Sequence, residues 1–276
     1  MNHRALALLL CALPALAIAQ DGVDPKHENH FRDVPPIETD ALTLSISDAH
    51  AQRPFAKFKA QITNNTADFL LYYVNETVFH FEHGDFKPNN GDAKRKPVII
   101  GPKDSKNPTV GVDGEDGFHR EKFSVDFSGF YRVSAEGTVH EAPNFKLPAA
   151  TNSFEAGPYR CSLSKVKQET KETYAKFKCT YTGDKVGLVT PRNLTVKTES
   201  GQTFANDDRK GDTELLFPGD DLSFSAIFHV PASVVDMQFA NLEVVWTDTF
   251  REAEAVALEV PSQAFELDPG KTAGKN

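Results

Sequence analysis

One histidine-rich stretch carries the chain's most concentrated set of metal-ligating side chains. In FHFEHGD, His80 and Glu82 stand two residues apart, and His83 and Asp85 follow at the next turn. Side chains two apart lie on the same face of a β-strand, so His80 and Glu82 point the same way. Imidazole and carboxylate groups bind Zn²⁺ and Cu²⁺. The stretch therefore predicts a metal site formed by His80, Glu82 and His83, provided that the backbone turns His83 toward the other two.

The N-terminal segment supplies further imidazoles. DPKHENHF contains His27 and His30, three residues apart, with Asp24 just before them. Both histidines would lie on one side of a helical turn and could join the same metal. The alternative is that His80 and Glu82 belong to an ordinary solvent-facing strand surface, since His-rich tracts are only compositional signals. We expect no cofactor, with bound Zn²⁺ or Cu²⁺ as the alternative that these residues leave open.

Catalytic motifs are missing from the sequence. It contains no Gly-x-Ser-x-Gly nucleophile elbow, no His-Glu-x-x-His pair and no phosphate-cradling glycine loop. We therefore expect that the protein is not an enzyme. An extracytoplasmic hydrolase is the third hypothesis, after a binding protein and a metal-binding protein, because residues far apart in sequence can converge in the fold.

A basic cluster marks a candidate binding loop. Between Phe86 and Phe123 the chain is about 19 residues longer than in the matching interval from Phe204 to Leu222. The longer interval holds the basic residues Lys94, Arg95, Lys96, Lys103 and Lys106. Loops on a rigid scaffold are a common seat of binding, although long surface loops are also tolerated at little cost. We expect a protein or glycan partner here.

The first nineteen residues predict export. Residues 1–19 carry one charged side chain, Arg4, and then an apolar run that ends in Ala17, Ile18 and Ala19. This is the form of a cleaved signal peptide, and the run is too short for a membrane span. The sequence therefore predicts a secreted or periplasmic protein. We expect no membrane span.

Composition narrows the classes of partner and fold. The chain has a net charge of −9, and removal of Arg4 with the signal leaves 29 basic against 39 acidic residues, which disfavours nucleic acid as a partner. There are 21 Phe against 2 Met and 1 Trp. Aromatic and β-branched residues suit a pleated, half-buried surface, so the composition favours an all-β fold.

Two cysteines remain after the predicted cleavage. Cys161 lies in YRCSLSKV and Cys179 in TYAKFKCTY, both of which alternate apolar and polar residues, and the charged KQETKE lies between them. If the two stretches form a hairpin centred on that charged segment, the two cysteines lie opposite each other on the core side. An exported chain with two cysteines favours pairing. We therefore predict a Cys161–Cys179 disulfide.

The tetrapeptide Ala-Lys-Phe-Lys occurs twice, 119 positions apart, at 56–59 and 175–178. In each copy a core-facing Phe alternates with solvent-facing Lys, as expected for the same strand of a duplicated domain. A shift of 119 places Leu42 and Ala60 at the two cysteine positions, so an apolar pair would replace the disulfide in the first copy. Residues 122–130 are further expected to match 221–230, because both follow turns that combine acidic residues with glycine.

Three motifs of the second copy carry a family resemblance: LTVKTESGQTF, FPGDDLSF and AIFHVP. Together they resemble the small immunoglobulin-like domains of unknown function found in secreted and envelope proteins of bacteria. The resemblance covers most of 159–260 and, more loosely, 41–148. It implies a β-sandwich used for interaction, and it carries no catalytic residues.

The sequence thus predicts an all-β protein with two tandem immunoglobulin-like β-sandwich domains after a cleaved signal peptide. Short strands with turn signals every 8 to 12 residues favour that architecture. The expected divisions are a signal peptide (1–19), a flexible N-terminal segment (20–38), sandwich one (39–148), a linker (149–156), sandwich two (157–264) and a disordered tail (265–276). The leading functional hypothesis is a non-catalytic exported binding or envelope-scaffold protein that engages a partner through loops or strand edges.

Overall fold

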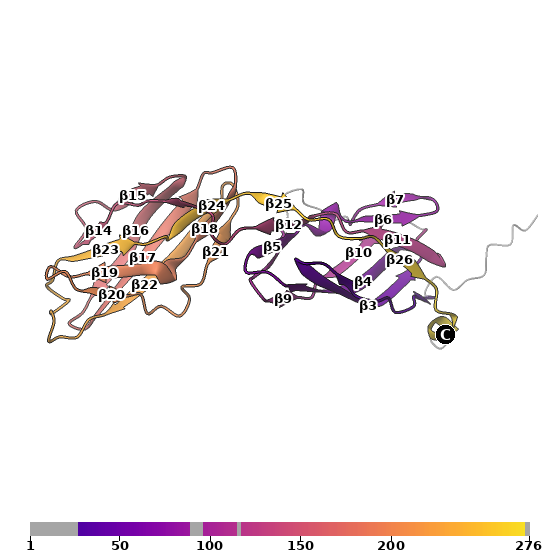
Figure 1. Cartoon of the computed structure of the whole chain (residues 1–276), viewed down its shortest axis with the longest axis horizontal. Coiled ribbons are helices and arrows are strands. Elements are labelled where there is room, and N and C mark those ends of the chain that lie inside the picture. The colour runs from indigo at the N-terminus through magenta and orange to yellow at the C-terminus, as the bar shows by residue number, and fades with distance from the viewer. Residues whose placement is uncertain (1–26, 89–95, 115–116, 274–276) are drawn as a thin grey trace, which may run out of the picture.

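The protein is all-β, with two β-lobes side by side along its long axis (Figure 1). The structure is a computed structural model that describes residues 27–88, 96–114 and 117–273. Its one α-helix is α1 (Pro269–Ala273), and no helix in these residues is long and apolar enough to cross a membrane. The all-β fold class predicted from composition is confirmed.

Lobe 1 is a sandwich built mostly from the first half of the chain. Its strands are β1 (Asn29–His30), β2 (Ile37–Glu38), β3 (Leu42–Gln52), β4 (Phe55–Asn64), β5 (Phe69–Tyr72), β6 (Val78–Phe81), β7 (Gly84–Phe86), β8 (Val98–Ile100), β9 (Ser105–Lys106), β10 (Thr109–Asp113), β11 (Lys122–Asp126), β12 (Phe130–Val133), β25 (Ala255–Ala257) and β26 (Gln263–Glu266). Sheet β1-β3-β4-β10 faces sheet β26-β11-β6-β7 across a phenylalanine-rich core. The Phe58 ring lies 5.7 Å from the Phe79 ring and 5.5 Å from the Phe265 ring, so both sheets meet at this residue.

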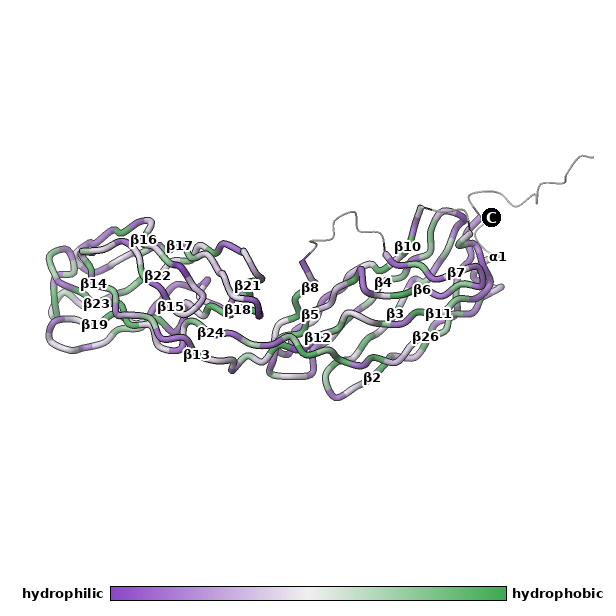
Figure 2. The backbone as a smooth tube through the Cα atoms, turned by 90° about the horizontal axis from the view of Figure 1, so that it is seen from above, coloured by the Kyte–Doolittle hydropathy of each residue, from purple (hydrophilic) through white to green (hydrophobic). Residues whose placement is uncertain are grey.

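Lobe 2 repeats the plan. Its strands are β13 (Thr138–His140), β14 (Phe145–Leu147), β15 (Ser153–Ala156), β16 (Tyr159–Gln168), β17 (Glu172–Tyr181), β18 (Val186–Val189), β19 (Leu194–Lys197), β20 (Thr203–Ala205), β21 (Glu214–Leu216), β22 (Asp221–His229), β23 (Leu242–Trp246) and β24 (Phe250–Ala253). Sheet β15-β16-β17-β22 faces sheet β14-β23-β19-β20, with Phe177 5.0 Å from Trp246 between them. Apolar and polar residues alternate along the strands of both lobes (Figure 2).

The repeated tetrapeptide occupies the same place in both lobes. It lies on β4 and on β17, and these ten-residue strands have identical patterns of buried and exposed positions. Phe58 and Phe177 are each fully buried, at 1% and 0% exposure, while the flanking lysines face outward. Each strand is followed by a fully buried strand of four residues, β5 or β18, and then by a short 3₁₀ turn, Val74–Glu76 or Pro191–Asn193.

Two details of the predicted alignment are wrong. In lobe 1 Ala60 lies opposite Ile46, and Leu42 lies opposite Asn64. The difference arises because β17 begins three residues before its tetrapeptide and β4 only one residue before, so the second hairpin is longer at its tip. The lobe 1 counterpart of the cysteine pair is therefore Ile46 and Ala60.

The second error concerns the strand that pairs with the tetrapeptide strand. β22 pairs with β17, and in lobe 1 the strand that pairs with β4 is β10, not the segment 122–130. Strands β8, β9 and β10 account for much of the apparent insertion after Phe86. The sequence TVGVD gives a weak strand signal because it is short and contains Gly111. A Cβ there would come within 2.6 Å of the Lys57 Cβ, so glycine permits the close pairing.

The two lobes exchange their last strands. β13 and β14 follow lobe 1 in sequence but pair with β24 and β23 of lobe 2. β25 and β26 follow lobe 2 in sequence but pair with β12 and β11 of lobe 1. The exchange is reciprocal, because the donated strands take the same places in equivalent sheets. Sheet β26-β11-β6-β7 of lobe 1 corresponds to sheet β14-β23-β19-β20 of lobe 2, and sheet β25-β12-β5-β8 corresponds to sheet β13-β24-β18-β21.

The exchange changes the expected domain divisions. The chain crosses between lobes near Ser134–Gly137 and again at Glu254, whereas the predicted linker 149–156 contains β15, which belongs to lobe 2. The crossing segments run antiparallel, and Gly137 is required because a Cβ there would lie 2.6 Å from the Glu252 carbonyl oxygen. The lobes are thus joined by two paired strands.

The predicted flexible ends are also ordered where they are described. Phe31 is 2% exposed beside β1, and Phe265 on β26 is 1% exposed. Phe31 bridges to Leu267, and Lys271 on α1 bonds Asp33 at 2.8 Å. Both described ends of the chain therefore lie together on lobe 1. Each end pairs with a segment far away in sequence, which local composition does not reveal.

A small apolar cluster fills the boundary between the lobes. It combines Phe69, Leu71 and Val133 of lobe 1 with Val186, Leu188 and Ala253 of lobe 2. The two sets occupy equivalent positions. Phe69 and Leu71 on β5 correspond to Val186 and Leu188 on β18, and Val133 at the end of β12 corresponds to Ala253 at the end of β24. The boundary is therefore approximately two-fold symmetric, like the isologous interface of a homodimer.

A polar network fixes the donated strand β13. The Glu252 carboxylate on β24 accepts a hydrogen bond from the Tyr181 hydroxyl at 2.5 Å and pairs with His140 Nε2 at 2.8 Å. Burial and the adjacent Glu252 carboxylate raise the pKa of the Tyr181 phenol, which therefore remains a donor. Through Glu252, the network connects the donated strand β13 to β24 and β17 of lobe 2.

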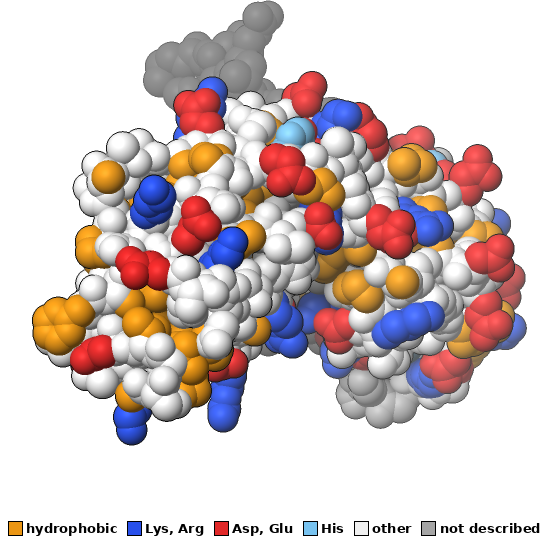
Figure 3. Space-filling view, turned by 60° about the vertical axis from the view of Figure 1, so that its left-hand side comes forward, with side chains coloured by type: hydrophobic (Ala, Val, Ile, Leu, Met, Phe, Trp, Pro, Cys, Tyr) orange, Lys and Arg blue, Asp and Glu red, His pale blue; other side chains and the backbone are white. Residues whose placement is uncertain are grey.

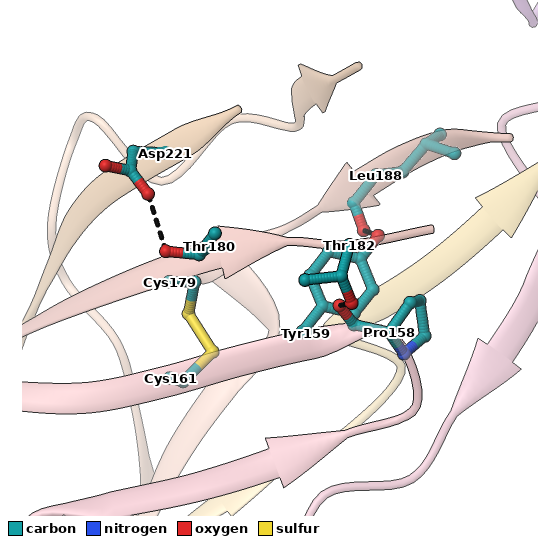
Figure 4. The surroundings of a disulfide bond; sticks show 8 residues. All are labelled: Pro158, Tyr159, Cys161, Cys179, Thr180, Thr182, Leu188 and Asp221. Carbon is teal, nitrogen blue, oxygen red and sulfur yellow. Dashed lines mark hydrogen bonds between the residues drawn. A yellow bond between two sulfur atoms is a disulfide. The ribbon is translucent and has the colours of Figure 1, made fainter. Parts of the chain in front are cut away.

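The predicted disulfide is confirmed. Cys161 and Cys179 lie directly opposite each other on β16 and β17 and are bonded, with both side chains facing the core (Figure 4). The bond joins two residues that are 18 positions apart in the sequence and so closes a loop. In the chain-entropy view such a loop stabilises the fold mainly by restricting the unfolded chain.

Reducing or removing this bond should destabilise the protein. We expect the double variant Cys161→Ser, Cys179→Ser to lose about 3 kcal/mol of unfolding free energy in urea titrations. The variant Cys161→Ile, Cys179→Ala, which copies the lobe 1 pair, should lose less because it keeps the core filled. Reductant should affect only the wild type. Equal stability of the wild type with and without reductant would contradict this account.

Strand exchange should make the two lobes unfold together. Phe265→Ala removes a buried ring from lobe 1 and should cost about 3 to 5 kcal/mol. The sole tryptophan, Trp246, lies in lobe 2, so its fluorescence reports the other lobe. In Phe265→Ala, we expect the unfolding midpoint measured by Trp246 fluorescence to fall by as much as the midpoint measured by circular dichroism. The exposed control Glu266→Ala should change neither, and a Trp246 midpoint that stays at the wild-type value would disprove the coupling.

Candidate functional site

A groove of about 890 Å³ lies over the outer face of sheet β26-β11-β6-β7 in lobe 1. Its floor follows from the strand register: Ser124 on β11 lies opposite His80 on β6 and opposite Ala264 on β26. Ser124 and Ala264 are small, and the next row holds the longer pair Lys122 and Glu266. The two small side chains lie between His80 and the longer pair, which leaves the sheet surface hollow at this point.

His80 lines the groove, as its outward position on β6 predicts. Its neighbours Phe79 and Phe81 point into the core. His80 Nδ1 lies 2.7 Å from an Asp85 oxygen and Nε2 lies 2.9 Å from an Asp126 oxygen. Hydrogen bonding to Asp85, then to Asp126, raises the pKa of the imidazole, which favours an imidazolium that donates from both nitrogens. Both nitrogens are therefore already engaged within the protein.

His83 does not join His80 and Glu82. Its ring packs 5.6 Å from Phe81 and 5.0 Å from Phe86, and a Cβ on Gly117 would meet its Nε2 at 2.6 Å. Glu82 lines the groove beside His80. Within the described ranges, no group of three or more His, Cys, Asp or Glu side chains is arranged to hold a metal ion. His80 and Glu82 thus line the groove, whereas His83 packs beside Phe81 and Phe86.

The N-terminal histidines serve a packing role in this structure. The His27 ring lies 5.2 Å from His119, and the His30 ring stacks 5.8 Å from His50. Burial, followed by the nearby His27 and Arg53, lowers the pKa of His119, which also lines the groove. The two contacts hold the segment around β1 against the rest of lobe 1. Asp24 lies outside the described residues.

The described basic residues of the predicted binding loop, Lys96, Lys103 and Lys106, each have a different partner. Lys94 and Arg95 lie outside the described residues. Lys96 Nζ contacts Asp220 of lobe 2 at 2.8 Å, Lys103 Nζ donates to a backbone carbonyl at 2.5 Å, and Lys106 Nζ lies 3.3 Å from Asp104. Each described lysine thus has its own local partner, and Lys96 links the two lobes.

Several groove residues carry no signal in the sequence. Ser124 and Ala264 are ordinary strand residues, and Glu266 lies in the tail that was expected to be disordered. Only the register of β11 against β6 and β26 brings them together. Since β26 comes from the far end of the chain, no local pattern could place Ala264 and Glu266 beside His80.

No protein-family model matches this chain, and no curated protein matches its sequence. The groove, the exchanged strands and the disulfide therefore carry the functional argument.

The pKa of His80 gives a direct test of the site. A folded-state pKa above 6.5 means that the imidazolium's stabilisation is fully present below pH 6.5 and is lost as the pH rises through the folded value. We expect the unfolding free energy of wild type to exceed that of His80→Gln by about 0.2 to 1 kcal/mol at pH 5.5. The two unfolding free energies should converge near pH 9. NMR titration of the ring should give a midpoint above 6.5, lowered in Asp85→Asn. A midpoint at or below 6.5 in wild type would exclude the arrangement.

Proposed function

We propose that this protein is an exported, non-catalytic binding module of two immunoglobulin-like repeats that holds an extended segment of a partner protein in the lobe 1 groove. The observation that carries the proposal is the groove itself, with small side chains along its floor and charged groups around it. Pockets with a few placed polar groups are the usual seats of ligand binding.

The charges around the groove favour a peptide ligand. Lys122 and Arg120 stand near Glu82, Glu121 and Glu266, so both signs of charge are present within one lining. An extended peptide offers backbone amides and side chains of either charge to such a surface. The His80 ring, flanked by two carboxylates, adds a fixed polar group at one side.

A glycan fits this surface less well. The two aromatic rings among the lining residues, Phe123 and Phe265, are 5% and 1% exposed, so neither presents its face to a sugar. We therefore choose a protein segment over a glycan. His80 supports the non-catalytic assignment, since both of its nitrogens are bonded to carboxylates and it is poorly placed to act as a general base.

Two observations support export. The Cys161–Cys179 bond is of the kind that persists in oxidising compartments. The first nineteen residues have the composition of a signal peptide, which would deliver the chain to the periplasm or beyond the cell. The two interlocked lobes then give the groove a rigid support, because β26 and β11 meet within it.

The proposal is tested by panning a phage-displayed peptide library on the purified protein. We expect enrichment of a peptide family whose affinity for Ser124→Arg, which fills the groove floor, falls at least about tenfold. Ser162→Arg makes the same change on β16 of lobe 2 and should leave affinity unchanged. The proposal fails if no family is enriched, or if the selected peptides bind Ser124→Arg as tightly as wild type.

A further inference from the structure

The longest strand at the end of a sheet, among those described, is β22 with nine residues. The other strands in such positions have two to five residues, a length that limits unwanted pairing. β22 contains no proline and no lysine in DLSFSAIFH. Natural proteins usually protect an exposed edge with such residues, so β22 lacks the common safeguards.

Part of this edge has hydrogen-bonding groups that point away from the sheet. At one end, Ile227 donates its N–H to the Asn206 side chain and accepts at its C=O from the Asp207 N–H. Both groups of Ile227 therefore face away from β17. In an antiparallel pair the direction alternates along the strand, so the backbone groups of Asp221, Ser223 and Ser225 face the same open side.

The backbone of the covering segment leaves the edge before Ser225, although one of its side chains still reaches that residue. After Asp207 the chain turns away at Asp208, whose carboxylate accepts from the Ser225 hydroxyl at 2.5 Å. Across the described ranges, no other segment bonds to the outward N–H and C=O groups of Ser223 and Ser225. The open run therefore spans Asp221 to Ser225.

We propose that β22 pairs antiparallel with β22 of a second copy of this chain, about a two-fold axis at Ser223. The two sheets would then join into one continuous sheet. Ser223 would lie opposite its own equivalent, and Asp221 opposite Ser225 of the other copy. The pairing lies in lobe 2 and does not rest on the lobe 1 groove.

In this arrangement, charged residues beside the edge of one copy lie near residues of opposite charge in the other copy. Ser225 lies beside Lys176 on β17, so the row Lys176, Ser225 would continue into Asp221 of the other copy. Asp221 pairs with Lys178 of its own copy at 3.0 Å, and Lys176, which is exposed, is in none of the ion pairs of the described residues. Its long side chain can reach across one strand toward that carboxylate, and adjacent strands are about 4.8 Å apart.

The core face is also complementary. Leu222 is only partly buried at the end of the sheet, and Phe224 is 7% exposed. The same register places Leu222 opposite Phe224 of the other copy, and Phe224 opposite Leu222. Pairing would therefore cover the remaining exposed part of Leu222, which adds apolar contact to the backbone hydrogen bonds. The combination favours a second copy over an unrelated strand.

Sedimentation velocity across a concentration series tests the pairing on the full chain. Wild type should show a reversible dimer, and Ser223→Pro should raise its dissociation constant roughly tenfold or more, since proline lacks the outward N–H but leaves the bonds to β17 intact. Ser223→Thr keeps that N–H and should dimerise like wild type. Circular dichroism of each variant establishes that the fold is retained.

Cysteine substitution gives an independent readout. Under mild oxidation, Ser223→Cys should form a covalent dimer, because the two equivalent residues face each other within disulfide range. Ser225→Cys should not, since its equivalents would stand roughly 14 Å apart in the same register. A monomer at every concentration, or a dimer that ignores Ser223→Pro and cross-links no better at 223 than at 225, would overturn the proposal.

Discussion

The reciprocal exchange of strands between the lobes is the constraint on which the rest of the structure depends. Each lobe obtains two sheet-ending strands from the other half of the chain, so neither half contains a complete sandwich. The apolar boundary cluster and the Glu252 network stabilise the crossing that results. The groove also depends on it, because one wall of the groove belongs to β26, which arrives from the far end of the chain.

Local pattern was enough to predict the parts of the fold formed by neighbouring segments. The tetrapeptide strands and the Cys161–Cys179 hairpin could be read from alternation, since side chains two apart share a face and one charged turn joins the cysteine strands. Strand exchange could not be read in this way. β14 and β26 look alike in sequence, and only three-dimensional pairing decides which lobe receives each.

The candidate site shows the same limit. The outward position of His80 followed from its alternation with Phe79 and Phe81, but the two carboxylates that engage both of its nitrogens were not foreseen. Asp126 lies on another strand, and its approach depends on register. Small floor residues such as Ser124 have no distinctive sequence pattern, although their size creates the groove.

The meeting of both described chain ends on lobe 1 has a mechanical consequence. Phe31 bridges to Leu267 beside the core of that lobe, while lobe 2 lies at the other end of the molecule (Figure 1). The space-filling view shows the two lobes as two rounded masses (Figure 3). A pulling force applied through the two ends would separate paired segments one contact at a time and would first load only lobe 1. Lobe 2 would remain outside the path of that force, so a surface that tethers the chain by either end would still present lobe 2 outward as an unloaded arm.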